Sequence, residues 1–101
     1  MMGPSVEAAL KERLTRYLAL TERALALVRP SPPARSFLRG GAEDLLSMTR
    51  TYLQDARHFQ EEGDLVRALA AVSYAHAWLD AGVRLGLLDG GDDDQTFTQY
   101  R

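Results

Sequence analysis

The sequence predicts an all-α fold, a single antiparallel three-helix bundle with a helical hairpin at Gly63-Asp64. Three observations support this prediction. Apolar residues recur at helical spacing in three long segments, the last two segments meet at a very short turn, and the alternation typical of strands is almost absent. The 101 residues suffice for one domain but not for two. We expect residues 1–90 to form the bundle and residues 91–101 to form a flexible acidic tail.

The first helix is expected over about residues 5–29. Ser5 is a suitable N-cap because its hydroxyl can accept hydrogen bonds from N–H groups that the first helical turn leaves unpaired. One face of this helix carries Val6, Leu10, Leu14, Tyr17, Thr21, Ala24 and Val28. Pro30 ends the helix. The segment Pro30-Ser31-Pro32-Pro33, which we call the proline-rich crossing, is expected to be extended, because each proline fixes its own φ and restricts the residue before it.

The second helix is expected over about residues 42–62. Before it, we expect the side chains of Phe37 and Leu38 to be buried in the core. Gly40-Gly41 is expected to break the chain's conformation so that a new helix begins after it. The apolar face of this helix is predicted to consist of Leu45, Met48, Tyr52, Ala56 and Phe59.

The third helix is expected over about residues 64–88, closed by Gly90-Gly91. Gly63 suits the left-handed position after one helix and Asp64 suits the N-cap of the next, so the two helices must run antiparallel. At 100° per residue, one side of the third helix carries Ala68, Ala71, Ala75, Trp78, Gly82 and Leu85. Small residues there let neighbours approach closely, which predicts a central helix with Trp78 as an anchor of the core.

The composition is that of an ordinary globular protein, with 46% hydrophobic residues and a formal net charge of -2. This charge does not suggest a strongly cationic protein that binds nucleic acids or membranes. The absence of cysteine excludes a disulfide framework, a thiol nucleophile and a zinc site with cysteine ligands. No apolar run approaches the ~20 residues that a membrane span requires. No membrane partner is therefore expected, and a cytoplasmic location is expected by default.

Four polar residues form a wedge of roughly 80° on the third helix by helical-wheel arithmetic. They are Ser73, His76, Asp80 and Arg84. His76 and Asp80 are four residues apart, so the carboxylate could orient the imidazole for general acid–base chemistry. Alternatively, the wedge is a solvent-facing sector or a satisfied polar ladder. We favour this second interpretation because such pairs are common on exposed helix faces, and we assign no catalytic residue.

A metal site is also considered, because Asp55 and His58 on the second helix repeat the acid and imidazole of Asp80 and His76. Counted from the hairpin turn, however, the two histidines lie roughly 10 Å apart along the bundle. Ligands of one ion lie ~2 Å from it, so we predict no metal and no cofactor.

Arginines surround the proline-rich crossing, where no acidic residue occurs between Arg23 and Glu43. Arg29, Arg35 and Arg39 are the candidate contacts if the protein binds nucleic acid, because guanidinium groups pair with phosphates. The alternative is a loop with solvated arginines. No basic segment interleaved with aromatic residues and no recognised nucleic-acid motif supports the first interpretation.

The hairpin also carries a set of residue blocks at consistent spacing. They are Tyr52, Asp55-Ala56, His58-Phe59, Glu62-Gly63-Asp64 and the run SYAHAWLDAGVRLGLL from Ser73. This pattern resembles the archaeal domain-of-unknown-function family 357, strongly over the C-terminal two-fifths and by length and pattern over the first helix. The resemblance implies a compact helical bundle in an archaeal cytoplasm. It implies no activity.

Our leading functional interpretation is a non-enzymatic module that binds a protein partner or associates with itself. The third helix is more apolar than a helix with one exposed bundle face needs to be. The first alternative is a nucleic-acid-associated accessory protein that uses the basic crossing. An enzyme that uses His76 and Asp80 is the second alternative.

Overall fold

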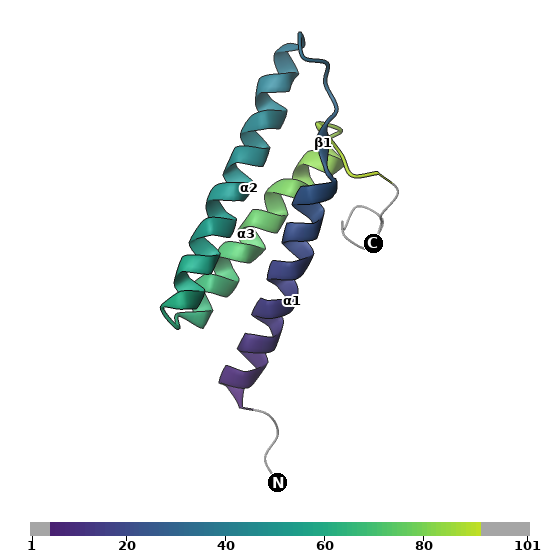
Figure 1. The fold of residues 1–101 in the computed structure, drawn as a ribbon. Coiled ribbons are helices and arrows are strands. Elements are labelled where there is room, and N and C mark those ends of the chain that lie inside the picture. The colour runs from purple at the N-terminus through teal and green to yellow at the C-terminus, as the bar shows by residue number, and fades with distance from the viewer. Residues whose placement is uncertain (1–4, 92–101) are drawn as a thin grey trace.

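The computed structural model describes residues 5–91, which form three helices packed side by side (Figure 1). The helices are α1 (Val6–Leu27), α2 (Phe37–Glu61) and α3 (Leu65–Arg84). The short strands β1 (Arg29–Pro30) and β2 (Leu88–Asp89) pair antiparallel beside the helix ends. Helix α3 packs along both α1 and α2, whereas α1 and α2 touch each other much less. The predicted all-α three-helix bundle is confirmed. Apart from Gly91, the predicted acidic tail lies outside the described residues.

Helix α1 begins as predicted, because the Ser5 hydroxyl accepts a hydrogen bond of 3.0 Å from the Ala8 N–H. It ends at Leu27, two residues earlier than expected, where Val28 turns into the extended region. The side chain of Val28 remains buried against the bundle. The chain therefore leaves α1 directly into β1. None of the helices described between residues 5 and 91 is long and apolar enough to cross a membrane.

The hairpin between α2 and α3 has the predicted turn chemistry. Gly63 adopts a positive φ of 77°, which glycine reaches without the steric cost of a side chain. The N–H groups of Gly63 and Asp64 donate back to Gln60 and Phe59 carbonyls at 3.0 and 2.9 Å, which satisfies the end of α2. The Asp64 carboxylate accepts from the Arg67 N–H at 3.1 Å and caps α3. These bonds hold the two helices antiparallel.

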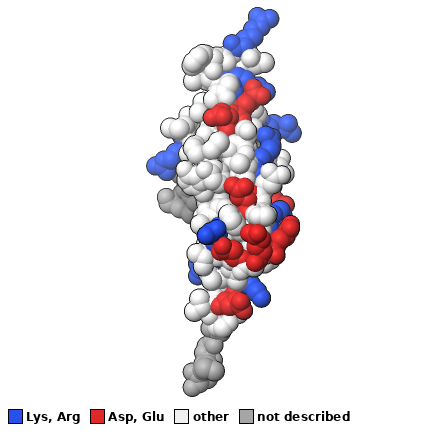
Figure 2. Space-filling view, turned by 90° about the vertical axis from the view of Figure 1, so that its left-hand side faces the viewer, with Lys and Arg blue, Asp and Glu red and all other residues white. Residues whose placement is uncertain are grey.

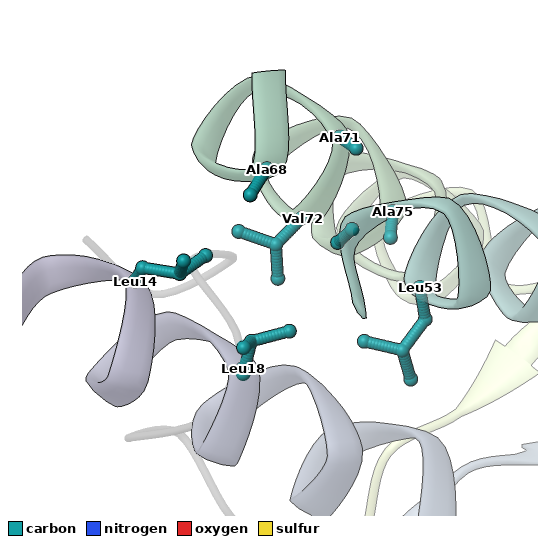
Figure 3. Packing of buried hydrophobic residues seen from close by; sticks show 8 residues of the cluster. Leu14, Leu18, Leu53, Ala68, Ala71, Val72 and Ala75 are labelled. Carbon is teal, nitrogen blue, oxygen red and sulfur yellow. The ribbon is translucent and has the colours of Figure 1, made fainter. Parts of the chain in front are cut away.

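Small residues on α3 let both neighbours approach closely. Figure 3 shows Leu14 and Leu18 of α1 and Leu53 of α2 converging on α3. The α3 members of this cluster are Ala68, Ala71, Val72 and Ala75. A second cluster toward the other end of the bundle centres on Leu79, which is fully buried. The core therefore follows α3 along its length, as expected for the central helix.

Helix α2 begins at Phe37, five residues earlier than predicted. The Ser36 hydroxyl accepts from the Leu38 N–H at 3.1 Å, and this cap lets the helix continue through Gly40 and Gly41. Its first turns extend beyond the ends of α1 and α3 (Figure 1). The expectation that Phe37 and Leu38 enter the core is therefore wrong. Phe37 is 96% exposed, because no other helix reaches that level.

Helix α3 ends at Arg84, four residues earlier than predicted. Gly86, with a positive φ of 78°, follows the end of the helix, so the helix is closed by Gly86 and not by Gly90-Gly91 as expected. The chain then turns back, and the buried side chain of Leu88 packs against Gly82. Leu85 was expected on the inner side but is 74% exposed, because it is the cap residue at which the chain leaves the helix.

The inner face of α2 is rotated relative to the prediction. Its buried residues are Ala42, Leu46, Thr49, Leu53 and Ala56. Of the predicted face only Ala56 is buried, while Leu45, Met48, Tyr52 and Phe59 are half-buried at its edge. Trp78 is likewise half-buried, so it is not the core anchor that we expected. Its indole N–H is buried without an acceptor, which offsets part of the gain from burying the ring.

Candidate functional site

Two polar residues of the predicted wedge meet a residue of α1. His76 Nε2 lies 3.6 Å from Asp80 Oδ1, as their spacing predicts, and His76 Nδ1 lies 3.0 Å from Thr21 Oγ1. The histidine and aspartate side chains are only 14% and 21% exposed, and Thr21 is 1% exposed. The structure therefore places a polar cluster, Thr21–His76–Asp80, in the seam between α1 and α3.

The cluster orients the imidazole through both of its nitrogens. Nδ1 faces the Thr21 hydroxyl at 3.0 Å and Nε2 faces the Asp80 carboxylate at 3.6 Å, and the tautomer of the ring sets which group donates to which. Because Thr21 is almost fully buried, a substrate in solution does not reach its hydroxyl. The geometry thus fixes the position of α1 along α3 and offers little space for a reaction.

The other two residues of the wedge do not join this cluster. Ser73 and Arg84 are exposed, so the wedge divides into a covered pair and an exposed pair. Thr21 was missed as a site residue because it occupies a position in the apolar face of α1. A buried hydroxyl in such a face needs a hydrogen-bond partner. A threonine among the apolar residues of α1 therefore indicates a polar partner on a neighbouring helix.

A second feature of α3 is the surface that it turns away from the core. Between Arg67 and Arg84, the exposed residues are Ala70, Ser73, Tyr74, Ala77 and Ala81, and none is charged. We call this surface the Ala77 face. The exposed surfaces of α1 and α2 differ, because each carries charged residues along its whole length. Between Arg67 and Arg84, the fully exposed side chains of α3 are therefore small or aromatic, and the Asp80 carboxylate, 21% exposed, lies beside His76.

Aromatic side chains line one edge of the Ala77 face, where α3 meets α2. The rings of Tyr52 and Tyr74 meet edge to face with centroids 4.5 Å apart, and Tyr74 meets Trp78 at 5.7 Å. The Arg67 guanidinium lies 5.8 Å from the centre of the Phe59 ring. A shallow hollow lies among these side chains, lined by Tyr52, Asp55, Phe59, Arg67, Ala70, Ala71 and Tyr74.

The three candidate arginines of the crossing do not form one group of free cations. Arg39 donates to the Pro32 carbonyl at 3.0 Å and lies 3.6 Å from the Glu43 carboxylate. Arg29 lies in β1, in register with Asp89 of β2. Arg35 is exposed. Part of the cationic charge thus supports the first turns of α2.

The residues of the metal hypothesis lie in different surroundings. His58 Nε2 lies 3.4 Å from Glu62 Oε1 on the surface of α2, whereas His76 lies in the seam between α1 and α3. Within residues 5–91, no group of three or more histidine, aspartate or glutamate side chains is arranged to hold a metal ion.

The pattern of the whole bundle identifies its family. Residues 16–88 match the model of a family described as a protein of unknown function, DUF357. The chain belongs to this family. The DUF357 match begins within α1 and ends in β2, so it covers the C-terminal part of the first helix as well as the hairpin. No curated protein and no solved structure matches the chain. The description of this family assigns no function.

Proposed function

We propose that this DUF357 protein is a non-enzymatic interaction module that binds another protein chain through the Ala77 face. One observation carries the proposal: between Arg67 and Arg84, a length of about 25 Å at 1.5 Å per residue, every fully exposed residue of α3 is uncharged, and the one carboxylate there, Asp80, is only 21% exposed. A helix that is apolar on both sides is usually covered on both sides, and the outer side of α3 approaches that pattern with three alanines and Tyr74. The core covers one side, and a partner would cover the other.

The side chains of the face suit a helical partner. Ala70, Ala77 and Ala81 are small, so the axis of a second helix could approach to the 8–10 Å that is typical of packed helices. Tyr74 stands beside them and is half exposed. Tyrosine and tryptophan at the centre of an interface often contribute most of the binding energy, and here Tyr74 is held in place by Tyr52 and Trp78.

The two alternative functions have less support. Nucleic-acid binding through Arg29, Arg35 and Arg39 would compete with the bonds that Arg39 makes to Pro32 and Glu43. An enzymatic role for His76 and Asp80 would need an accessible reacting group, and the third member of their cluster is buried.

Site-specific photo-cross-linking in cells tests the proposal. A photoreactive amino acid replaces Ala77, and the same residue replaces Ala19, an exposed alanine of α1, as the matched control. We expect discrete cross-linked species of the Ala77 variant and none of the Ala19 variant. Equal labelling at both positions, or no species at position 77, would contradict the proposal.

A further inference from the structure

We infer that the hollow between α2 and α3 binds a basic side chain, lysine or arginine, of the partner that covers the Ala77 face. This inference rests on the proposed function and names the chemistry that the partner presents there. Three properties of the described residues support it: an unpaired carboxylate in a row of aromatic rings, a cation already held at one end of the hollow, and the continuity of the hollow with the Ala77 face.

The α2 wall of the hollow places a carboxylate between two aromatic rings. Tyr52, Asp55 and Phe59 follow one another at spacings of three and four residues, so their side chains form one row along the helix. On the α3 wall, Ala70 and Ala71 are small and leave the space open. The hollow measures about 400 Å³, which is near the lower end of the range for ligand sites. A space of this size accommodates a single long side chain.

The Asp55 carboxylate is available to a cation. It is exposed, and in the described part of the chain no hydrogen bond or ion pair involves it. The arginines near it in the hairpin are paired elsewhere. Arg57 pairs with Glu22 of α1, and Arg67 lies 3.3 Å from the Asp64 carboxylate. Figure 2 shows acidic side chains gathered at the level where Figure 1 places the hairpin. A basic side chain of a partner would thus meet a carboxylate that has no cation of its own.

One end of the hollow already holds a cation against a ring. The Arg67 guanidinium lies 5.8 Å from the centre of the Phe59 ring, within the ~6 Å over which an aromatic face attracts a positive charge. At the other end, the rings of Tyr52 and Tyr74 lie 4.5 Å apart between centroids, and Tyr74 is 49% exposed. Asp55 lies between the two ends. A cation bound to this carboxylate would therefore also lie beside aromatic rings.

The hollow continues into the Ala77 face, because Ala70 and Tyr74 belong to both. A helix that lies along this face passes beside the hollow. Lysine and arginine carry a charged group on a long apolar stem, so the stem can lie against the alanines while the charged group reaches Asp55. An apolar side chain in the same place would cover the carboxylate and leave its charge unpaired, and an acidic one would repel it. The hollow therefore selects a basic side chain.

Charge reversal at Asp55 tests the inference in the cross-linking assay. The photoreactive amino acid stays at position 77, and Asp55→Lys is compared with Glu61→Lys, which reverses an exposed carboxylate of α2 that does not line the hollow. We expect Asp55→Lys to lower the yield of the cross-linked species at least about fivefold, because it places like charges together, and Glu61→Lys to leave the yield unchanged. Circular dichroism confirms that both variants fold. Equal yields from the two variants would overturn the inference.

A charge swap identifies the basic side chain itself. Mass spectrometry of the cross-linked peptide gives the segment of the partner that lies on the Ala77 face. We expect glutamate in place of one lysine or arginine of this segment to restore cross-linking to the Asp55→Lys variant, and failure of every such replacement would overturn the inference. Cross-linking from position 77 that is indifferent to Asp55 would refute the basic side chain and leave the proposed function standing. No cross-linked species from the chain with Asp55 intact would contradict the proposed function, and the inference with it.

Discussion

The Thr21–His76–Asp80 cluster makes a quantitative prediction about stability. In Thr21→Val the side chain keeps its shape but loses the hydroxyl that lies 3.0 Å from His76 Nδ1. The loss of one buried hydrogen bond costs about 1–3 kcal/mol, and His76 keeps a small exposure through which water can compensate. We therefore expect a loss of about 1–2 kcal/mol in the free energy of unfolding.

Thr49→Val is the matched control, because Thr49 is also buried and the substitution removes the same atom. The Thr49 hydroxyl donates to the Leu45 carbonyl of its own helix at 2.8 Å, and that carbonyl can keep its backbone partner without it. Its loss should cost at most about 0.5 kcal/mol. The difference between the two variants isolates the contact between α1 and α3.

Urea unfolding measures both variants, with the fluorescence of Trp78 and circular dichroism as two probes. For a chain of this size the slope is about 1 kcal/mol per molar urea, so Thr21→Val should lower the midpoint by about 1–2 M. In a His76→Leu background the same substitution should no longer destabilise and should recover stability, because the buried Thr21 hydroxyl has already lost this hydrogen bond. Equal midpoints for Thr21→Val and Thr49→Val would refute the reasoning.

Three further substitutions test the packing of α3 and the start of α2, each by urea unfolding. Gly82→Ala should destabilise by about 1–3 kcal/mol, because the added methyl would lie 2.5 Å from Leu88 Cδ1 and 2.8 Å from its Cγ; a gain in stability would contradict the close approach. Gly40→Ala should stabilise by about 0.5–1 kcal/mol, because this helical glycine has open space around it; a loss would mean that α2 does not begin before residue 40. Leu79→Ala should cost about 2–5 kcal/mol, and a cost below about 1 kcal/mol would exclude Leu79 from the centre of the core.

Local signals in the sequence predict the hairpin. Gly63 supplies the positive φ of the turn and Asp64 caps α3, and both roles depend only on residues nearby in the sequence. The ends of the helices are harder to predict where two signals compete. Gly40-Gly41 is typical of a break, yet the cap at Ser36 starts the helix before it. Gly86 and Gly90-Gly91 are both suitable terminators, and the sequence alone does not rank them.

Part of the candidate site could also be predicted from local spacing, and part could not. The spacing of His76 and Asp80 predicts their proximity, because residues four apart face each other on any helix. Thr21 lies 55 residues away, so only the packing of α1 against α3 brings it to the histidine. A helical wheel likewise does not show where α1 and α2 lie around α3. It therefore placed Trp78 in the core, although Leu79 occupies the centre.

The central claim is that a partner covers the Ala77 face in the cell. The most direct measurement compares the alkylation rate of a single cysteine in cells with its rate in dilute purified protein, which is practical because the chain has no other thiol. We predict that Ala77→Cys reacts several times more slowly in cells than in dilute solution, whereas Ala19→Cys reacts alike in both after correction for reagent entry. Equal reactivity of the cysteine at position 77 in the two settings would contradict the claim.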